Sequence, residues 1–114
     1  MATTFMHPSS QPSIDSFVDA LWLEDGLSTN TLQAYRRDLT LYARWLGTQG
    51  LALNDTTETL LNGYFADQHA STRATSANRR LSVFKRYFHW ALRERMVVVD
   101  PTLRLQSAKQ PLRV

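Results

Sequence analysis

The chain has 114 residues, enough for one folded domain with a single hydrophobic core and too few for a second domain of similar size. It contains no cysteine, which excludes disulfides, thiolate metal sites and thiol nucleophiles and agrees with a reducing compartment. The first residues lack the basic and apolar parts of a signal peptide, and no apolar run approaches the ~20 residues that span a bilayer. The expected location is therefore cytoplasmic.

The formal net charge is +3, and the charges are distributed unevenly along the chain. Residues 1–35 carry four acidic side chains and no lysine or arginine. Residues 71–114 carry ten basic side chains and only two acidic ones, a net charge of +8. Clustered positive charge is typical of surfaces that bind polyanions, so the carboxy-terminal part is the candidate binding region.

The amino-terminal third predicts a leader followed by one helix. Residues 1–12 are rich in proline, serine and threonine and are expected to be a disordered leader. Ser13 is the predicted N-cap of a helix that continues to about Glu24 and is ended by Gly26. The other edge of this helix is acidic, so we do not expect it to face DNA.

Two further helices are predicted before residue 70. Ser28 is a good N-cap for a helix to about Leu46, because apolar residues recur there at spacings of three and four and glycines follow. A third helix is expected from about Thr56 to His69, with Gly63 as a weak point inside it.

The last predicted helix is the longest and the most basic. We expect Thr75 or Ser76 to cap it and the helix to end near Arg95. Its predicted apolar stripe consists of Ala77, Leu81, Phe84, Phe88, Ala91 and Leu92. Residues 96–99 should pack under the bundle, and a short fifth helical turn could follow Pro101. Residues 106–114 are expected to form an extended linker, and residues 13–105 an all-α fold, a compact bundle of four main helices.

Two of these helices present polar faces that contain several cations. At about 100° per residue, the arc opposite the apolar stripe of the last helix collects Thr75, Asn78, Arg79, Ser82, Lys85, Arg86, His89 and Arg93. The equivalent arc of the second helix collects Thr29, Asn30, Gln33, Arg36, Arg37, Thr40 and Arg44, with Asp38 displaced to the other side. Cations bind phosphates, and amide and hydroxyl groups on a helix can contact base edges in the major groove. The free amino-terminal N–H groups of the last helix, beside Arg73, Thr75 and Ser76, add a potential phosphate site.

Other chemistry has little support in the sequence. The three histidines are too scattered for a metal site, no carboxylates are paired at ligand or acid–base spacing, and there is no glycine-rich phosphate loop. No metal or cofactor is therefore expected. The four tyrosines fall on or beside apolar stripes, which favours core packing over nucleophilic catalysis. The tryptophans at the stripe borders leave open a helical adaptor that binds another protein.

Three segments carry a family resemblance: residues 14–39, residues 74–94, and the closing part with Asp100-Pro101 and residues 105–111. Together they closely resemble the amino-terminal core-binding domain of XerD-type tyrosine recombinases, which belong to the phage-integrase family. The strings Asn30-Thr31-Leu32 and Arg79…Leu81-Ser82…Arg86 are its more specific parts. XerC-type recombinases are the nearest alternative, and phage or mobile-element integrases are a looser one.

The resemblance implies a SAM-like helical bundle that covers one face of duplex DNA while a separate carboxy-terminal domain closes on the other. It also implies strand exchange at a recombination site in a tetramer with a XerC-like recombinase, activated by an FtsK-type translocase, for chromosome dimer resolution and partition at cell division. By this match the residues near the DNA backbone would be Thr31, Tyr35 and Arg36. Those at or near the groove would be Ser76, Arg79, Ser82, Lys85 and Arg86. Lys85 stands where arginine is usual, and Asn78 where a small residue is usual.

The catalytic set of this family is expected in the carboxy-terminal domain and not in this chain. That set includes a His-x-x-Arg pair, and none of His7, His69 and His89 has arginine three residues later. The resemblance therefore predicts a non-catalytic fragment that ends where the linker to the catalytic domain should lie. Three classes stay open at this point: a DNA-binding module of a recombinase, a helical protein-interaction module and, least favoured, a complete small enzyme.

Overall fold

The computed structural model describes residues 6–68 and 74–105, the latter with side chains from Ala77 onward. This part of the chain contains four α-helices, two short helical turns and no strand, which confirms the predicted all-α class. The chain divides into two compact units, residues 1–56 and 57–114. The expectation of one domain over residues 13–105 stays a prediction, and the expected linker at 106–114 lies outside the described residues.

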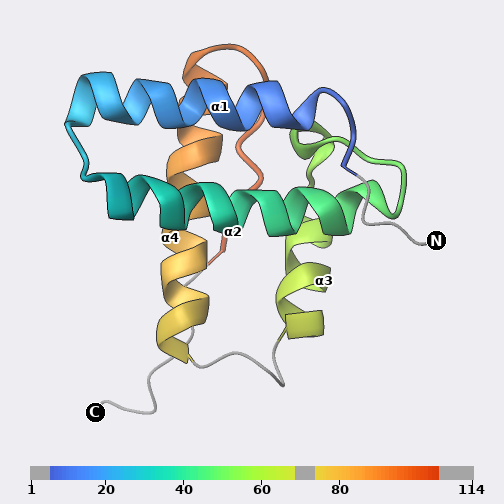
Figure 1. Cartoon of the computed structure of the whole chain (residues 1–114). Helices are drawn as coiled ribbons and strands as arrows, with labels where there is room; N and C mark the ends of the chain where they lie inside the picture. The colour runs from blue at the N-terminus through green and yellow to red at the C-terminus, as the bar shows by residue number, and fades with distance from the viewer. Residues whose placement is uncertain (1–5, 69–73, 106–114) are drawn as a thin grey trace. The chain divides into compact units, whose positions relative to one another are not determined.

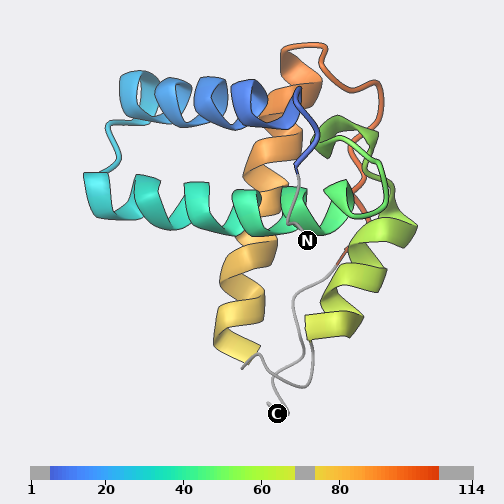
Figure 2. The same ribbon diagram turned by 45° about the vertical axis from the view of Figure 1, so that its right-hand side comes forward.

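The first unit is built around two long helices. Helix α1 (Ser10–Ala20) continues into a π-helical turn, η1 (Leu21–Asp25), and α2 (Thr29–Gly47) runs back antiparallel beside α1 (Figures 1 and 2). A short 3-10 turn, η2 (Leu53–Asp55), completes the unit and was not predicted. The fully buried apolar residues of this unit are Ile14, Phe17, Leu39, Tyr42, Ala43, Leu46 and Leu53.

The N-cap of the first helix is Ser9, four residues before the predicted Ser13, so residues 10–12 lie in the helix and not in a leader. Pro12 lies in the first turn, where a backbone N–H would have no helical acceptor, and its ring therefore costs no hydrogen bond. Ser13 is buried inside the helix and is not its cap: its hydroxyl donates to the Ser9 carbonyl (3.2 Å). Gly26 ends η1 in the left-handed region with φ of 63°, as its position in the sequence predicted.

Helix α2 begins as the sequence predicted. Ser28 has an extended backbone, and its hydroxyl oxygen accepts a hydrogen bond from the Thr31 N–H (3.2 Å). Beyond the last helical residue, Gly47, the chain reverses at Gly50, which adopts φ of 76°. A side chain at Gly50 would meet no neighbouring atom, so glycine is favoured there by its backbone angle alone.

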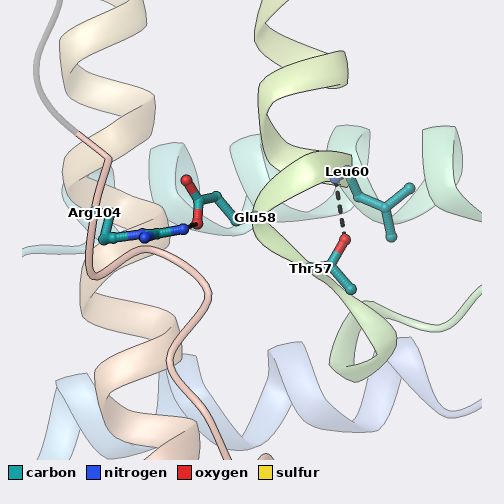
Figure 3. Close-up of polar contacts among 4 residues, drawn as sticks. All are labelled: Thr57, Glu58, Leu60 and Arg104. Atoms are coloured by element: carbon teal, nitrogen blue, oxygen red, sulfur yellow. Dashed lines mark hydrogen bonds and ion pairs between the residues drawn. The ribbon is translucent and has the colours of Figure 1, made fainter.

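The second unit contains the remaining two helices. Helix α3 spans Glu58–Gln68, and the predicted final residue of this helix, His69, lies outside the described residues. Thr57, one residue after the predicted start, accepts the Leu60 N–H (3.2 Å; Figure 3). Helix α4 spans Ala74–Arg93, so Thr75 and Ser76 lie inside the helix and neither is its N-cap, contrary to prediction.

Helix α4 turns one apolar face inward. Phe84 is fully buried and its ring lies 6.2 Å from that of Tyr64 and 5.7 Å from that of Phe65, between ring centroids. Tyr87 is also fully buried, although the predicted stripe omitted it, whereas Leu92 is 38% exposed. Leu92 was wrongly placed on the stripe because it lies one helical step beyond Ala91, past the edge of the buried face.

The segment after α4 differs from the prediction. Two residues after the end of α4, Arg95 adopts a left-handed backbone with φ of 64°. Val98 and Val99 are 92% and 65% exposed, so residues 96–99 do not pack as a covered apolar segment. Residues 101–104 form hydrogen-bonded turns, and the fifth helical turn that could follow Pro101 is not formed.

Candidate nucleic-acid interface

One side of α4 exposes a row of basic and hydrogen-bonding side chains, which we call the α4 basic face. Its exposed members are Arg79, Ser82, Lys85, Arg86, His89 and Arg93. All six were predicted on the arc opposite the apolar stripe, and Asn78, also predicted there, is half-buried. The helix contains no aspartate or glutamate, and Glu94, which follows its last residue, pairs with Arg93 (3.2 Å).

The spacing of the site residues explains why they share one side of the helix. Arg79, Ser82 and Arg86 follow one another at intervals of three and four residues, which places side chains above one another along a helix. The opposite side is anchored by the buried Phe84 and Phe88. The rotation of the helix is therefore fixed by packing, and the α4 basic face is held toward solvent.

Lys85 has a specific partner on this face. Its ammonium nitrogen, Nζ, donates to the backbone carbonyl of Leu105 at 2.8 Å. The side chain predicted to approach DNA is therefore also an attachment point for the end of the described chain. This contact joins residues twenty positions apart and has no signature in the helical pattern.

The polar arc of α2 is less basic than the sequence suggested. Arg36 forms an ion pair with Asp15 of α1, so an acidic group from the preceding helix compensates one cation of this arc. The hydrogen bond from Arg36 and a second from Gln11 lower the pKa of the Asp15 carboxyl. The pattern of α2 alone could not reveal this neighbour, because Asp15 comes from the preceding helix.

The other predicted residues of α2 lie in mixed surroundings. Thr31 and Tyr35 are half-buried, and the Thr31 hydroxyl accepts a hydrogen bond from the Ser28 hydroxyl (3.0 Å). Arg37 and Arg44 are exposed, whereas Asp38 is only 1% exposed, in agreement with its predicted displacement from the arc.

Two predicted residues cannot be placed by their side chains. Arg73 lies outside the described residues, and Ser76 is placed only as a backbone position in the first turn of α4. The residues that the structure does place on one face are Arg79, Ser82, Lys85 and Arg86, all from a single helix.

Sequence reasoning missed a second set of contacts, made by residues 100–104 near the end of the described chain. The Arg104 guanidinium donates from Nε and one terminal nitrogen to Oε1 of Glu58, at 3.2 and 3.0 Å (Figure 3). Asp100 accepts hydrogen bonds from the N–H and hydroxyl of Thr102, at 2.8 and 2.6 Å, and both residues are buried. The one sequence feature that could have indicated the turn is the Asp100-Pro101 dipeptide, because Asp-Pro is typical of turns.

Three other expectations can be compared with the described part of the chain. Tyr42, Tyr64 and Tyr87 are buried, which confirms their assignment to the core, and Tyr35 is half-buried. Within residues 6–68 and 74–105, no three histidine, aspartate or glutamate side chains gather where they could hold a metal ion. No helix among these residues is long and apolar enough to cross a membrane.

The model of the phage integrase N-terminal SAM-like domain matches residues 14–95. The chain belongs to this family, which confirms the resemblance found in the sequence. Among curated proteins, it is 60% identical over 107 residues to the tyrosine recombinase XerD of Ralstonia nicotianae, covering 94% of this chain and 35% of that relative.

Tyrosine recombinases XerD of other bacteria are similar to this chain at lower sequence identity. The Pseudomonas putida protein is 43% identical over 97 residues, covering 82% of this chain and 32% of the relative. The Proteus mirabilis protein is 41% identical over 102 residues, covering 89% of this chain and 33% of that relative. This chain therefore spans about a third of the length of these curated relatives.

Proposed function

We propose that this chain is the DNA-binding, non-catalytic domain of a XerD-type site-specific tyrosine recombinase. The observation that carries the proposal is the α4 basic face, which is exposed and set on a helix without acidic residues. The similarity to proteins named tyrosine recombinase XerD supports the same conclusion. The relatives are about three times longer, and we assign strand cleavage to the part of them that this chain does not match.

The α4 basic face is suited to the major groove of duplex DNA. An α-helix fits this groove, and the guanidinium groups of Arg79 and Arg86 can bind phosphates or the O6 and N7 atoms of guanine. The Ser82 hydroxyl between them can donate to or accept from a base edge or a phosphate. The backbone N–H groups at the start of α4, near Arg73 and Ser76, would add a phosphate contact.

Helix α2 would contribute a weaker contact with the DNA backbone. In this proposal Thr31 and Tyr35 approach the phosphates, and Arg36 joins them only after its ion pair with Asp15 opens. A phosphate and a carboxylate compete for the same guanidinium. Arg36 should therefore add less to the affinity for DNA than an arginine without a carboxylate neighbour would.

The biological setting follows from the XerD-like relatives and belongs to the proposal. The full-length protein would act in the cytoplasm on a recombination site, in a tetramer with a XerC-like recombinase and under an FtsK-type translocase, to resolve chromosome dimers. A phage or mobile-element integrase is the alternative within the same family. Recombination of a plasmid carrying the cognate chromosomal site would favour the first role.

A protein-interaction module is the second candidate, and one observation favours it. Trp22 and Leu23, in the π-helical turn after α1, are 55% and 79% exposed. Large exposed apolar side chains are common anchors of protein interfaces. Salt separates the two candidates, because phosphate contacts release counterions and apolar contacts do not.

The test is a salt series of binding to a mixed-sequence duplex, measured by fluorescence anisotropy. Each phosphate contact contributes about 0.9 to the log–log salt slope, so the double variant Arg79→Ala/Arg86→Ala should lower the slope by about 2 and weaken binding. Melting should change little, because exposed substitutions usually cost less than about 0.5 kcal/mol.

Arg95→Asn is the matched control for this experiment. It removes one exposed cation outside the α4 basic face, and asparagine tolerates the positive φ of this position. An unchanged slope in the double variant would refute the DNA-binding assignment of the face. Covalent attachment of the purified chain to a nicked duplex would refute its non-catalytic character.

A further inference from the structure

The end of the described chain is attached to the second unit in three different ways. The first is a buried turn, in which the Asp100 carboxylate accepts both hydrogen bonds from Thr102. Thr102 is 2% exposed and Leu105 is 8% exposed, so the segment is packed at these two positions, whereas Leu103 between them is 73% exposed. The carbonyl of Thr102 also accepts the Leu105 N–H at 3.1 Å.

The second attachment is the ion pair between Arg104 and Glu58, at the first turn of α3 (Figure 3). It lies on α3 and involves no residue of the α4 basic face. Arg104 has a side chain that is 81% exposed, so water screens this pair and its contribution is small.

The third attachment is the hydrogen bond from the Lys85 ammonium to the Leu105 carbonyl. It differs from the other two because its donor belongs to the α4 basic face. A neutral carbonyl is a weaker partner for an ammonium than an anionic oxygen, since hydrogen bonds between two ionised groups are shorter and stronger. A phosphate that reaches this face would therefore compete with Leu105 for Lys85.

We propose that Lys85 is a switch between two acceptors, the Leu105 carbonyl in the free chain and a DNA phosphate in the complex. Binding of DNA then releases Leu105 from α4, while the Asp100–Thr102 turn and the Arg104–Glu58 pair keep the preceding residues in place. The proposal rests on the proposed function, because it needs a phosphate at the α4 basic face. It adds a role for Lys85 in loosening the chain at Leu105 when the duplex is bound.

The test follows Leu105 by nuclear magnetic resonance, using the labelled 114-residue chain with and without a mixed-sequence duplex. The carbonyl ¹³C shift of Leu105 reports its acceptor bond, and exchange of its amide proton reports opening of the turn. Loss of one hydrogen bond should raise amide exchange about two- to tenfold. We expect this rise, with a changed carbonyl shift, when DNA is added to the unaltered chain.

Two variants separate the switch from general loosening of the segment. Lys85→Met keeps the aliphatic stem and removes the ammonium, so exchange at Leu105 should already be high without DNA and should not rise when DNA is added. Arg104→Met breaks the pair with Glu58 and leaves the α4 basic face unaltered, so the rise caused by DNA should persist.

Each result supports or overturns a defined part of the proposal. If DNA binds and the carbonyl shift and amide exchange of Leu105 stay unchanged, Lys85 keeps its bond to the carbonyl and the switch is refuted. The same holds if Lys85→Met responds to DNA as the unaltered chain does. If no duplex binds at all, the proposed function fails instead, and the free-chain comparison of Lys85→Met still shows whether Lys85 restrains Leu105.

Discussion

Helices α2 and α4 have similar patterns but different surroundings. Each buries one apolar side and carries cations among hydroxyl and amide groups on the other. On α2 the central cation, Arg36, is paired with Asp15 from the neighbouring helix, whereas α4 contains no acid of its own and Glu94, just after it, pairs with Arg93. A helical wheel thus shows which side chains point outward, but compensation of their charges depends on the neighbouring element.

The largest expected effect separates the two sides of α4. Phe84→Ala should lower the free energy of unfolding by about 3 to 5 kcal/mol. The fully buried ring packs against Tyr64 and Phe65, and its removal leaves a cavity. Urea denaturation followed by circular dichroism measures this loss. Ser82→Ala, on the exposed side, is the control and should change stability by less than about 0.5 kcal/mol. Equal losses in the two variants would contradict the assigned faces of α4.

A smaller effect is expected from making the surface of α2 more like that of α4. Asp15→Asn removes the carboxylate that holds Arg36, so the duplex should bind more tightly and the salt slope should rise by up to about 0.9. Asp19→Asn is the matched control, since it removes an equal charge from an exposed position on the same helix. Equal gains from both substitutions would show a general charge effect and no specific role for the Asp15–Arg36 pair.

The smallest expected effect is a dependence of stability on pH. The pKa of Asp15 is lowered in the folded chain, chiefly by the hydrogen bond from Arg36, so the ionised carboxylate stabilises the fold. This contribution is fully present above the ordinary aspartate pKa of about 4 and is lost as the pH falls through the lowered value. It should be below about 1 kcal/mol, because both side chains are partly exposed.

Urea titrations between neutral pH and about pH 2.5 measure this contribution as a difference between the unaltered chain and Asp15→Asn. The unaltered chain should be the more stable at neutral pH, and the difference should shrink on acidification. A difference that grows as the pH falls would reverse the sign and contradict the assigned pair.

The sequence predicted the parts of the fold that depend on local pattern. The N-cap at Ser28, the ends at Gly26 and Gly47, and the exposed arc from Arg79 to Arg93 all follow from residue type and helical spacing, and the structure confirms them. Family membership was also evident from the residues themselves, since the matched region, residues 14–95, includes the first two of the three segments that carried the resemblance.

The predictions that failed concern the start of the first helix, the burial of residues 96–99, and contacts between residues that are distant in sequence. Pro12 was counted with the leader rich in proline, serine and threonine, although proline is tolerated in the first turn of a helix. Val98 and Val99 were expected to be covered because they are apolar, but no described neighbour buries them. The partners of Arg36 and Lys85 come from other segments, and no local pattern specifies such pairs.

The π-helical turn at Leu21–Asp25 has a consequence for how the chain can vary in length. Its hydrogen bonds enclose one residue more than those of an α-helix, so the turn absorbs an inserted residue without rotating the helix before it. Leu21 remains buried at its start, and the left-handed Gly26 closes it. Loss or gain of a single residue between these two points can therefore redirect Trp22 and Leu23 around the helix axis while the helix before them keeps its orientation.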